Sequence, residues 1–327
     1  WVSLEPRATG PDTRPDQFHI EWSWQPRGGC LILPKEARRV RMAVACSTEN
    51  ASRSSWYLDD AAFHVVSYKE YARKQSEAPA LEDFTMMLVD TLAADRLDGY
   101  GFSRGHTPNL RLLASEGTLY ENTVTAAPWT RPSIASIFTS RYPSQHTAEL
   151  LNSPIPDRFT TLAESMKARG YFTAAFVRTY FDGFIGPGTG FGQGFDLYYY
   201  SVDEDAVFAA AKAFLDLNQE ALRQHKGGIF LLFHFFEPHS SYQNHVPTFL
   251  ENKGTMGPLL MNETIDAIVN RGEDPDQTNH ADMEYARACY DSELYFMDQR
   301  IGELLFRFKQ LDLYEKMNIL FTADHGE

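Results

Sequence analysis

Runs of mainly hydrophobic residues recur from residue 84 onward, and amphipathic stretches lie between them. Four runs are expected to be buried strands, at residues 84–89, 171–177, 228–236 and 317–322. The stretches between them have helical spacing, at residues 108–116, 161–169, 204–225 and 283–310. Apolar strands separated by helices predict an α/β fold, with a mostly parallel central sheet flanked by helices on both faces.

Two of the predicted helices have terminal residues that fit their positions. Thr107 stands before Pro108, the order expected for an N-cap residue followed by proline at the first helical position. Gly170 directly follows the segment 161–169, and glycine often ends a helix because it adopts a left-handed backbone without strain. These two helical predictions therefore rest on end signals as well as on periodicity.

Residues 1–68 follow a different pattern. Short apolar or aromatic runs with period-two alternation are separated by glycine, proline, serine and asparagine, which is typical of an antiparallel β-sandwich. The run WYLDDAAF at 56–63 resembles the last strands of jelly-roll modules found beside carbohydrate-active enzymes, and a plain structural β-extension is the alternative. We therefore expect a partial β-sandwich at 1–68, a charged connector at 69–82 and a second unit at 83–327.

The segment 240–282 interrupts the alternation of strands and helices. It has little hydrophobic periodicity, so it is expected to leave the core as a long excursion. Long excursions in compact domains often form lids or binding loops.

Composition narrows the class of protein. Hydrophobic residues make up 43% of the 327 residues and charged residues 23%, as in ordinary globular proteins. The formal net charge of -14 argues against a nucleic-acid-binding protein, and it requires local positive charge wherever an anionic substrate binds. No run approaches the ~18 consecutive apolar residues of a membrane span. Three cysteines form no disulfide framework, so they leave the cellular compartment open.

Polar residues that can bind a metal or transfer a proton follow three of the predicted strands. Asp90 follows the first strand, His239 follows the run that ends at residue 236, and Asp324 and His325 follow the last strand. Ligands of open α/β sheets bind beyond the carboxyl ends of the strands, so these ends can face one crevice. Carboxylates and an imidazole suit a divalent cation such as Ca²⁺, Mg²⁺, Mn²⁺ or Zn²⁺, although a single aspartate after a strand is commonly only a cap or turn residue.

The sequence around these residues carries a family resemblance. It lies in MLVDTLAADRLDGYG at 87–101, PWTRPS at 128–133, RYP at 141–143 and FTADHGE at 321–327. In this order the motifs resemble those of sulfatases in the alkaline-phosphatase superfamily. The resemblance implies an alkaline-phosphatase-like core at 83–327, a metal site that includes Asp90, Asp324 and His325, and one divalent cation with calcium preferred. It also implies that further active-site residues lie beyond residue 327.

The position of the nucleophile departs from the family motif. Sulfatases carry Cys or Ser in a C/S-x-P-x-R motif, and that residue is oxidised to formylglycine. The matching segment here begins with Thr130 and has Ile134 in place of the motif arginine. A threonine side chain has no route to an aldehyde, because its alcohol is secondary. The resemblance therefore does not extend to a formylglycine mechanism.

Thr130 can serve as a nucleophile in its own right and as a metal ligand. It precedes Pro132 at the expected start of a helix, where unpaired N–H groups and the positive end of the helix dipole favour anions. A bound metal would lower the pKa of its hydroxyl. Relatives in the superfamily that process phosphoesters resemble this arrangement. The alternative is that Thr130 only caps the helix.

Two histidines and two arginines complete the candidate site. His146 resembles a family position near the nucleophile, and His239 resembles the family histidine that assists the leaving group. A histidine can shuttle a proton near neutral pH. Arg131 or Arg141 could contact the anionic group, and packing or surface roles are equally compatible with the sequence.

The resemblance implies a metal-dependent hydrolase of a sulfate ester, or of a related phosphate or phosphonate ester, with Thr130 as nucleophile. Two alternatives remain: a phospho-group transferase that acts through Thr130, and a non-catalytic relative that binds glycans. The implied partner is an anionic ester, with a sulfated glycan as one example, and the implied location is outside the cytoplasm.

Overall fold

The computed structural model describes most of the second half of the chain and parts of the first. The described residues are 17–18, 39–40, 81–102, 106–181, 183–224, 228–240, 242, 245 and 280–326. The chain divides into two compact units, residues 1–79 and 80–327. In the first unit, strands β1 (Gln17–Phe18) and β2 (Arg39–Val40) pair in parallel, unlike the antiparallel pairing expected there.

Two predictions fall largely outside the described residues. The predicted sandwich at 1–68 is described only at β1 and β2, which are too short to define its architecture. The predicted excursion at 240–282 is described only at residues 240, 242, 245 and 280–282.

A five-stranded parallel sheet forms the centre of the second unit. Its strands are β3 (Asp83–Val89), β4 (Phe172–Arg178), β5 (Leu197–Ser201), β6 (Ile229–Phe235) and β7 (Met317–Ala323). They lie in the order β5-β4-β6-β3-β7, and every neighbouring pair is parallel. This confirms the predicted α/β fold with a parallel sheet. Strand β5 was not predicted, because its tyrosine-rich run is short and only partly buried.

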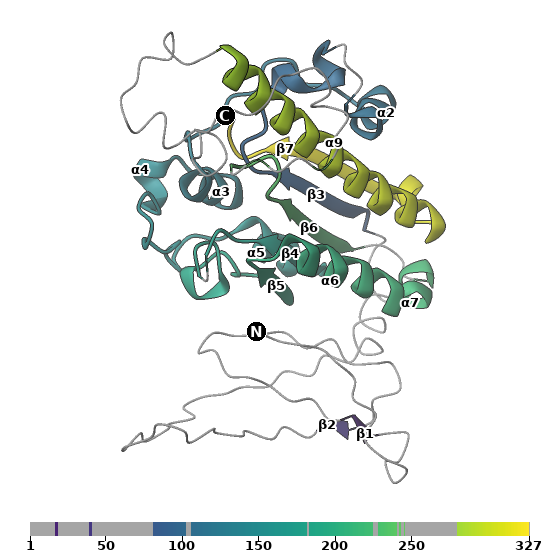
Figure 1. Ribbon diagram of the computed structural model, residues 1–327. Coiled ribbons are helices and arrows are strands. Elements are labelled where there is room, and N and C mark those ends of the chain that lie inside the picture. The colour runs from purple at the N-terminus through teal and green to yellow at the C-terminus, as the bar shows by residue number, and fades with distance from the viewer. Residues whose placement is uncertain are drawn as a thin grey trace, which may run out of the picture. The chain divides into compact units, whose positions relative to one another are not determined.

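Helices pack on both faces of this sheet (Figure 1). One face carries α3 (Thr130–Thr139) and α5 (Leu162–Ala168), whose apolar side chains form one core with Leu88 and Leu232. The other face carries α6 (Glu204–Leu217) and α9 (His280–Gln310). There Phe233 of β6 packs on Phe308 of α9, and Phe176 of β4 packs on Phe214 of α6.

The other helices within the described residues are short. They are α2 (Pro108–Glu116), α4 (Pro143–His146), α7 (Gln219–Gln224) and the 3-10 helices Ala94–Arg96, Asp98–Tyr100, Pro187–Thr189 and Tyr314–Lys316. The single helix predicted at 204–225 is in fact two helices, α6 and α7. They are separated at Asn218, whose side-chain amide donates to the carbonyl of Phe214 at 2.7 Å. The side chain shares this carbonyl with the backbone N–H of Asn218, which donates to it at 3.2 Å.

The cap of α2 differs from the sequence prediction. The Thr107 hydroxyl accepts a hydrogen bond from the backbone N–H of Asp98, not from the first turn of α2. The Asp298 carboxylate of α9 caps the helix instead, accepting the N–H groups of Asn109 and Leu110 at 3.1 and 2.9 Å. A tertiary contact thus supplies the oxygen that a local N-cap would otherwise provide.

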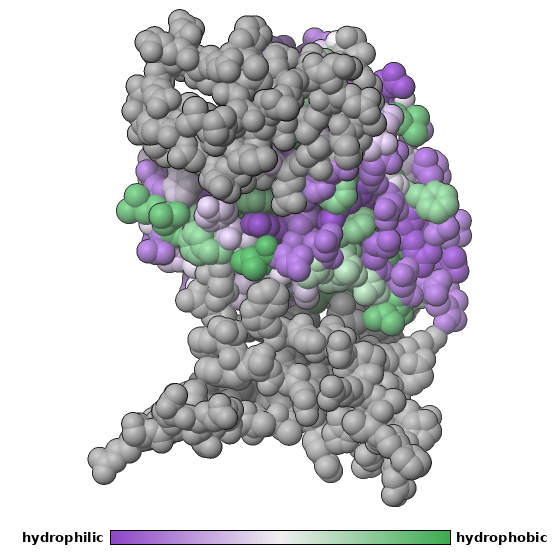
Figure 2. Space-filling view, viewed as in Figure 1, coloured by the Kyte–Doolittle hydropathy of each residue, from purple (hydrophilic) through white to green (hydrophobic). Residues whose placement is uncertain are grey.

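The surface is mixed in character. In Figure 2 the face over α6 and α9 is mainly hydrophilic, with separate hydrophobic residues among the polar ones. Among the described residues, no helix is long and apolar enough to cross a membrane.

Candidate functional site

The sheet register brings the candidate metal ligands to one face. Leu88 of β3 pairs with His234 of β6 and with Thr322 of β7. Side chains two positions apart on a strand point to the same face, so Asp90 and Asp324 share this face with Leu88. It is the face on which α3 packs. The ladder also continues past the strand ends, since the N–H of Asp90 donates to the carbonyl of Phe235 and that of Asp324 to Val89, each at 3.0 Å.

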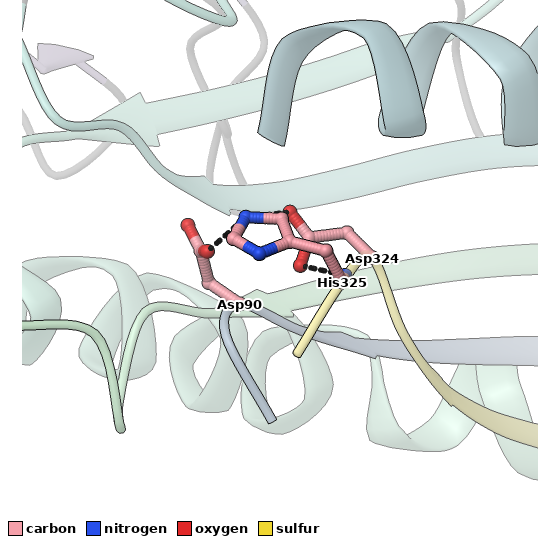
Figure 3. Close-up of side chains that lie close together, drawn as sticks. All are labelled: Asp90, Asp324 and His325. Atoms are coloured by element: carbon pink, nitrogen blue, oxygen red, sulfur yellow. Dashed lines mark hydrogen bonds and ion pairs between the residues drawn. The ribbon is translucent and has the colours of Figure 1, made fainter. Parts of the chain in front are cut away.

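Asp90, Asp324 and His325 form a compact group at this end of the sheet (Figure 3). One ligand atom from each lies within 4.8 Å of the others, and all three residues are buried. His325 Nε2 lies 3.3 Å from Asp90 Oδ1 and 3.7 Å from Asp324 Oδ2. The Asp324 carboxylate is oriented by the backbone N–H of His325 at 2.6 Å and that of Thr91 at 3.3 Å.

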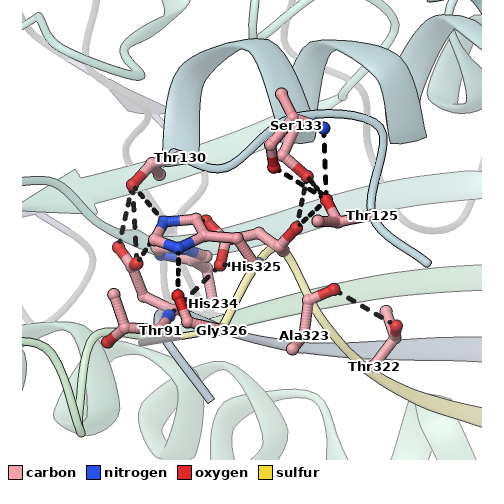
Figure 4. Close-up of polar contacts among 12 residues, drawn as sticks. Thr91, Thr125, Thr130, Ser133, His234, Thr322, Ala323, His325 and Gly326 are labelled. Carbon is pink, nitrogen blue, oxygen red and sulfur yellow. Dashed lines mark hydrogen bonds and ion pairs between the residues drawn. The ribbon is translucent and has the colours of Figure 1, made fainter. Parts of the chain in front are cut away.

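Thr130, the first residue of α3, reaches into this group (Figure 4). Its hydroxyl lies 3.3 and 3.4 Å from the Asp90 carboxylate oxygens and 3.4 Å from His325 Nε2. The structure therefore brings together all four side chains named as metal ligands, although Thr130 is 40 residues from Asp90 in sequence.

The electrostatics of the group suit a cation. Burial and the charge of Asp90 raise the pKa of Asp324 to about 8. Burial acts to lower the pKa of His325, but its hydrogen bond to Asp90 and the charge of Asp324 outweigh burial and raise the pKa to about 9. Asp324 Oδ2 is buried and accepts no hydrogen bond from the described residues. A divalent cation between the two carboxylates would remove their repulsion and give this oxygen a partner, so the donor set fits a metal.

A strained turn follows Asp90 and is held by a tyrosine of α9. Thr91 has a φ of 50°, a left-handed conformation that is rare for a β-branched residue. The Tyr290 hydroxyl donates to the carbonyl of Thr91 at 2.9 Å and accepts the N–H of Ala93 at 2.8 Å. Both bonds keep the turn in the form that points the Thr91 N–H at Asp324.

Two hydroxyl groups hold the backbone in place at Asp324. Thr125 and Ser133 both donate to its backbone carbonyl, and their own oxygens lie 2.9 Å apart (Figure 4). Ser133 belongs to the first turn of α3, so these bonds tie the Thr130 helix to the strand that carries Asp324 and His325.

The structure places His146 away from this group. It is fully buried against α3, and its Nε2 lies 3.0 Å from the Ser136 hydroxyl and 3.2 Å from the carbonyl of Pro132. Its Nδ1 accepts the N–H of Ala148 at 3.0 Å, and burial lowers its pKa. These contacts hold His146 against α3, and a catalytic role for His146 stays a prediction.

His239 lies just beyond β6, at the same end of the sheet, and is partly exposed. Its Nδ1 lies 2.6 Å from the carbonyl of Ser240. A carbonyl only accepts hydrogen bonds, so Nδ1 carries the proton of this bond, and Nε2 is the ring nitrogen that can exchange a proton with a ligand. Its ring stacks on Phe236 at a centroid distance of 4.5 Å. Protonation of the leaving group by His239 stays a prediction.

Neither arginine named from the sequence lies at the site. Arg131 is fully buried and donates to the carbonyls of Phe184 and Ser153, while Arg141 lies over the ring of Phe159 at 4.9 Å. A cation that does lie near the site is Arg178, at the end of β4. Burial lowers its pKa, and the charges of Glu204, Glu237 and Asp90 act against that effect.

His234 is a second residue close to the site that was not predicted from the sequence. It is 3% exposed, and its Nδ1 lies 2.9 Å from the carbonyl of Arg178. Inspecting the end of every predicted strand, including the strand at 171–177, would have pointed to Arg178. His234 lies inside an apolar strand and gives no such signal.

Substitution of Tyr290 by phenylalanine is expected to weaken metal binding about tenfold, because outer contacts that orient ligands typically contribute that much. The ring would remain, so packing against Tyr242 at 5.5 Å should persist. A calorimetric titration of the metal-free protein measures the effect.

Tyr198→Phe is the matched control. Its buried hydroxyl donates to the carbonyl of Ile185 at 2.7 Å, toward the β5 edge of the sheet. Tyr290→Phe loses two hydrogen bonds and Tyr198→Phe loses one, each worth about 1 kcal/mol of stability. Only Tyr290→Phe should lose metal affinity, and an equal loss in both variants would contradict this role.

Comparison with known proteins gives the family. The protein-family model described as Sulfatase matches residues 84–327. The ulvan-active sulfatase of Formosa agariphila is 29% identical over 123 residues, covering 37% of this chain and 24% of that protein. The choline-sulfatase of Rhizobium meliloti is 22% identical over 301 residues, covering 72% of this chain and 56% of that protein. The chain thus spans about a quarter and about half of the length of these two relatives.

Solved structures support the fold. The phosphonate monoester hydrolase of Agrobacterium radiobacter superposes with a TM-score of 0.55 over 75% of this chain and 63% of that chain. The sequence identity is 16%, so this likeness concerns the fold alone.

Proposed function

Because the chain belongs to the sulfatase family of the alkaline-phosphatase superfamily, we propose that the whole protein is a metal-dependent hydrolase of sulfate esters. The observation that carries the proposal is the buried group of Asp90, Thr130, Asp324 and His325. Two carboxylates, an imidazole and a hydroxyl around one point can hold a divalent cation together with an anionic ester.

Thr130 is proposed as the nucleophile. Its oxygen attacks the sulfur atom of the ester while its proton passes to the Asp90 carboxylate, to which the hydroxyl already donates. The bond from sulfur to the leaving oxygen breaks, and the sulfuryl group is transferred to Thr130. Water then attacks the same sulfur and returns a proton to His239, Thr130 recovers its proton from Asp90, and sulfate is released. The positive end of α3, where the first N–H groups have no helical partner, favours the anion at this position.

His239 is proposed to protonate the leaving oxygen. Its Nδ1 proton is occupied by the carbonyl of Ser240, so a second proton on Nε2 would be the one transferred. Asp90, Asp324, His325 and Thr130 would hold the cation, with calcium as first choice because the carboxylates alone offer four oxygens. When bound, such a cation supplies positive charge beside the ester oxygens and lowers the pKa of the Thr130 hydroxyl.

The nucleophile leaves a second reaction open. A threonine that accepts a phosphoryl group could pass it to an alcohol instead of water, which would make the protein a phospho-group transferase. The two reactions differ only in the acceptor, so adding an acceptor alcohol and analysing the products separates them. A non-catalytic glycan-binding relative is the third candidate, and the intact set of ligand side chains favours it least.

The activity test uses the full-length protein with 4-nitrophenyl sulfate and bis(4-nitrophenyl) phosphate as alternative substrates. We expect turnover that a chelator abolishes and that added divalent metal restores, with the sulfate ester preferred. Preference for the phosphodiester would move the proposal to phosphoester chemistry. Glycan binding without metal uptake or turnover would favour the non-catalytic relative.

A further inference from the structure

Two exposed aromatic side chains follow β4 directly. Tyr180 is 59% exposed and Phe181 is 40% exposed, and their rings meet edge to face at a centroid distance of 6.0 Å. A single exposed aromatic residue needs no explanation. Two adjacent exposed aromatic residues at the carboxyl end of a strand do need an explanation, because ligands of such sheets bind there.

The Tyr180 ring adjoins His239. The Tyr180 ring lies 5.8 Å from the His239 ring, and both contact Phe236, at 6.2 and 4.5 Å. The Arg178 guanidinium lies 3.5 Å from the centre of the Phe236 ring. An alcohol that leaves toward His239 would therefore emerge beside Tyr180.

The two exposed rings are also backed by buried ones. Phe184, which is 7% exposed, contacts Phe181 at 5.1 Å and Tyr180 at 6.5 Å. Tyr180 is further supported by the stacked ring of Phe236. Rings held in this way keep a fixed orientation, which lowers the entropy lost when a ligand binds.

We infer that the Tyr180 ring is a platform on which a sugar ring of the leaving alcohol stacks, with its ester oxygen toward His239 and with the Phe181 ring bordering it at 73°. The negative face of an aromatic ring attracts the C–H groups of a pyranose, whose hydroxyls stay in water. The inference rests on the proposed function, because His239 is placed beside the leaving group there.

The exposure of these rings favours a sugar over a large apolar alcohol. A large apolar alcohol gains most from a pocket that encloses it. Tyr180 is 59% exposed and Phe181 is 40% exposed, so a ligand that lies on them keeps part of its surface in water. A pyranose suits such a surface, because it needs only one apolar face covered.

The test compares two kinds of ester in the full-length protein. The sugar esters are glucosamine 6-sulfate and galactose 6-sulfate, and ethyl sulfate has no ring. Tyr180→Ala is expected to raise KM for at least one sugar sulfate about tenfold and to change KM for ethyl sulfate by less than about twofold. Tyr180→Phe should keep most of the affinity, because the ring remains.

Tyr142→Ala is the matched control. Tyr142 is 69% exposed and lies beyond the far end of α3, roughly 15 Å along the helix from Thr130. It should leave KM for every ester unchanged. Equal changes for sugar and ethyl sulfates in Tyr180→Ala, or no change at all, would overturn the platform.

A second readout does not depend on turnover. If the parent protein cleaves none of these esters, the proposed function is at fault, and the platform is judged on binding alone. Saturation-transfer NMR with glucosamine and galactose should then show contact in the parent and in Tyr142→Ala but much less in Tyr180→Ala. Equal signals in all three proteins, or none in any, would reject the platform.

Discussion

Asp324→Asn is expected to remove the bound metal while leaving the metal-free fold intact. The asparagine oxygen can still accept the N–H groups of His325 and Thr91, which now bond to Asp324 Oδ1. What disappears is a negative charge on a buried oxygen that has no hydrogen-bond donor among the described residues. Since burial and Asp90 raise the pKa of Asp324 to about 8, losing that charge should not destabilise the metal-free protein.

Elemental analysis and thermal unfolding measure this effect together. A ligand at 100 times its Kd adds about 2.7 kcal/mol to stability, or roughly 5–10 °C in Tm for a unit of this size. The parent should show this shift on metal addition and the variant should not. Asp83→Asn is the control, because Asp83 is a buried aspartate at the opposite end of β3. Metal bound equally by Asp324→Asn and the parent would remove Asp324 from the site.

Thr130→Ala is expected to reduce kcat by at least about 10³-fold, because removal of a covalent nucleophile has effects of that size or larger. The hydroxyl would be lost from beside Asp90 and His325 while the helix backbone stays. Thr130→Ser keeps a hydroxyl at the same place and should retain turnover within about tenfold of the parent. Steady-state kinetics on whichever ester the parent cleaves best gives the comparison.

Thr139→Ala controls for the loss of a buried threonine from the same helix. Its hydroxyl bonds the carbonyl of Ala135 at 2.7 Å, at the other end of α3, so its loss should not affect kcat. A Thr130→Ala enzyme with the turnover of the parent would exclude the covalent route. Water would then be the direct nucleophile, and Thr130 would be left as a ligand or a helix residue.

Local sequence was sufficient to predict the strands that precede the candidate metal ligands. The run that became β3 is apolar because both faces of the sheet are covered there, whereas β7 lies at the end of the strand order and only its Met317 is buried. Polar residues follow both runs where the chain emerges at the sheet edge. The apolar pattern by itself therefore placed Asp90, Asp324 and His325 at strand ends. The motif order also indicated the family, which the match over residues 84–327 confirms.

Tertiary packing decided what the local pattern left open. Thr107 looked like the cap of α2, yet Asp298, 188 residues from Leu110, supplies the capping oxygen. The sequence around His146 resembles a family position near the nucleophile, and packing places the residue at the end of α4 with its ring buried against α3 and both ring nitrogens in hydrogen bonds.

Tertiary packing also decided which side chains hydrogen-bond to the backbone of the candidate site. Tyr290 reaches the strained turn at Thr91 from 199 residues away, and Thr125 reaches the carbonyl of Asp324 across the same distance in sequence. Periodicity and end signals describe how a segment buries its own side chains. The partner of a hydrogen-bonding group is set by which helices cover which face of the sheet, and only the folded chain determines that.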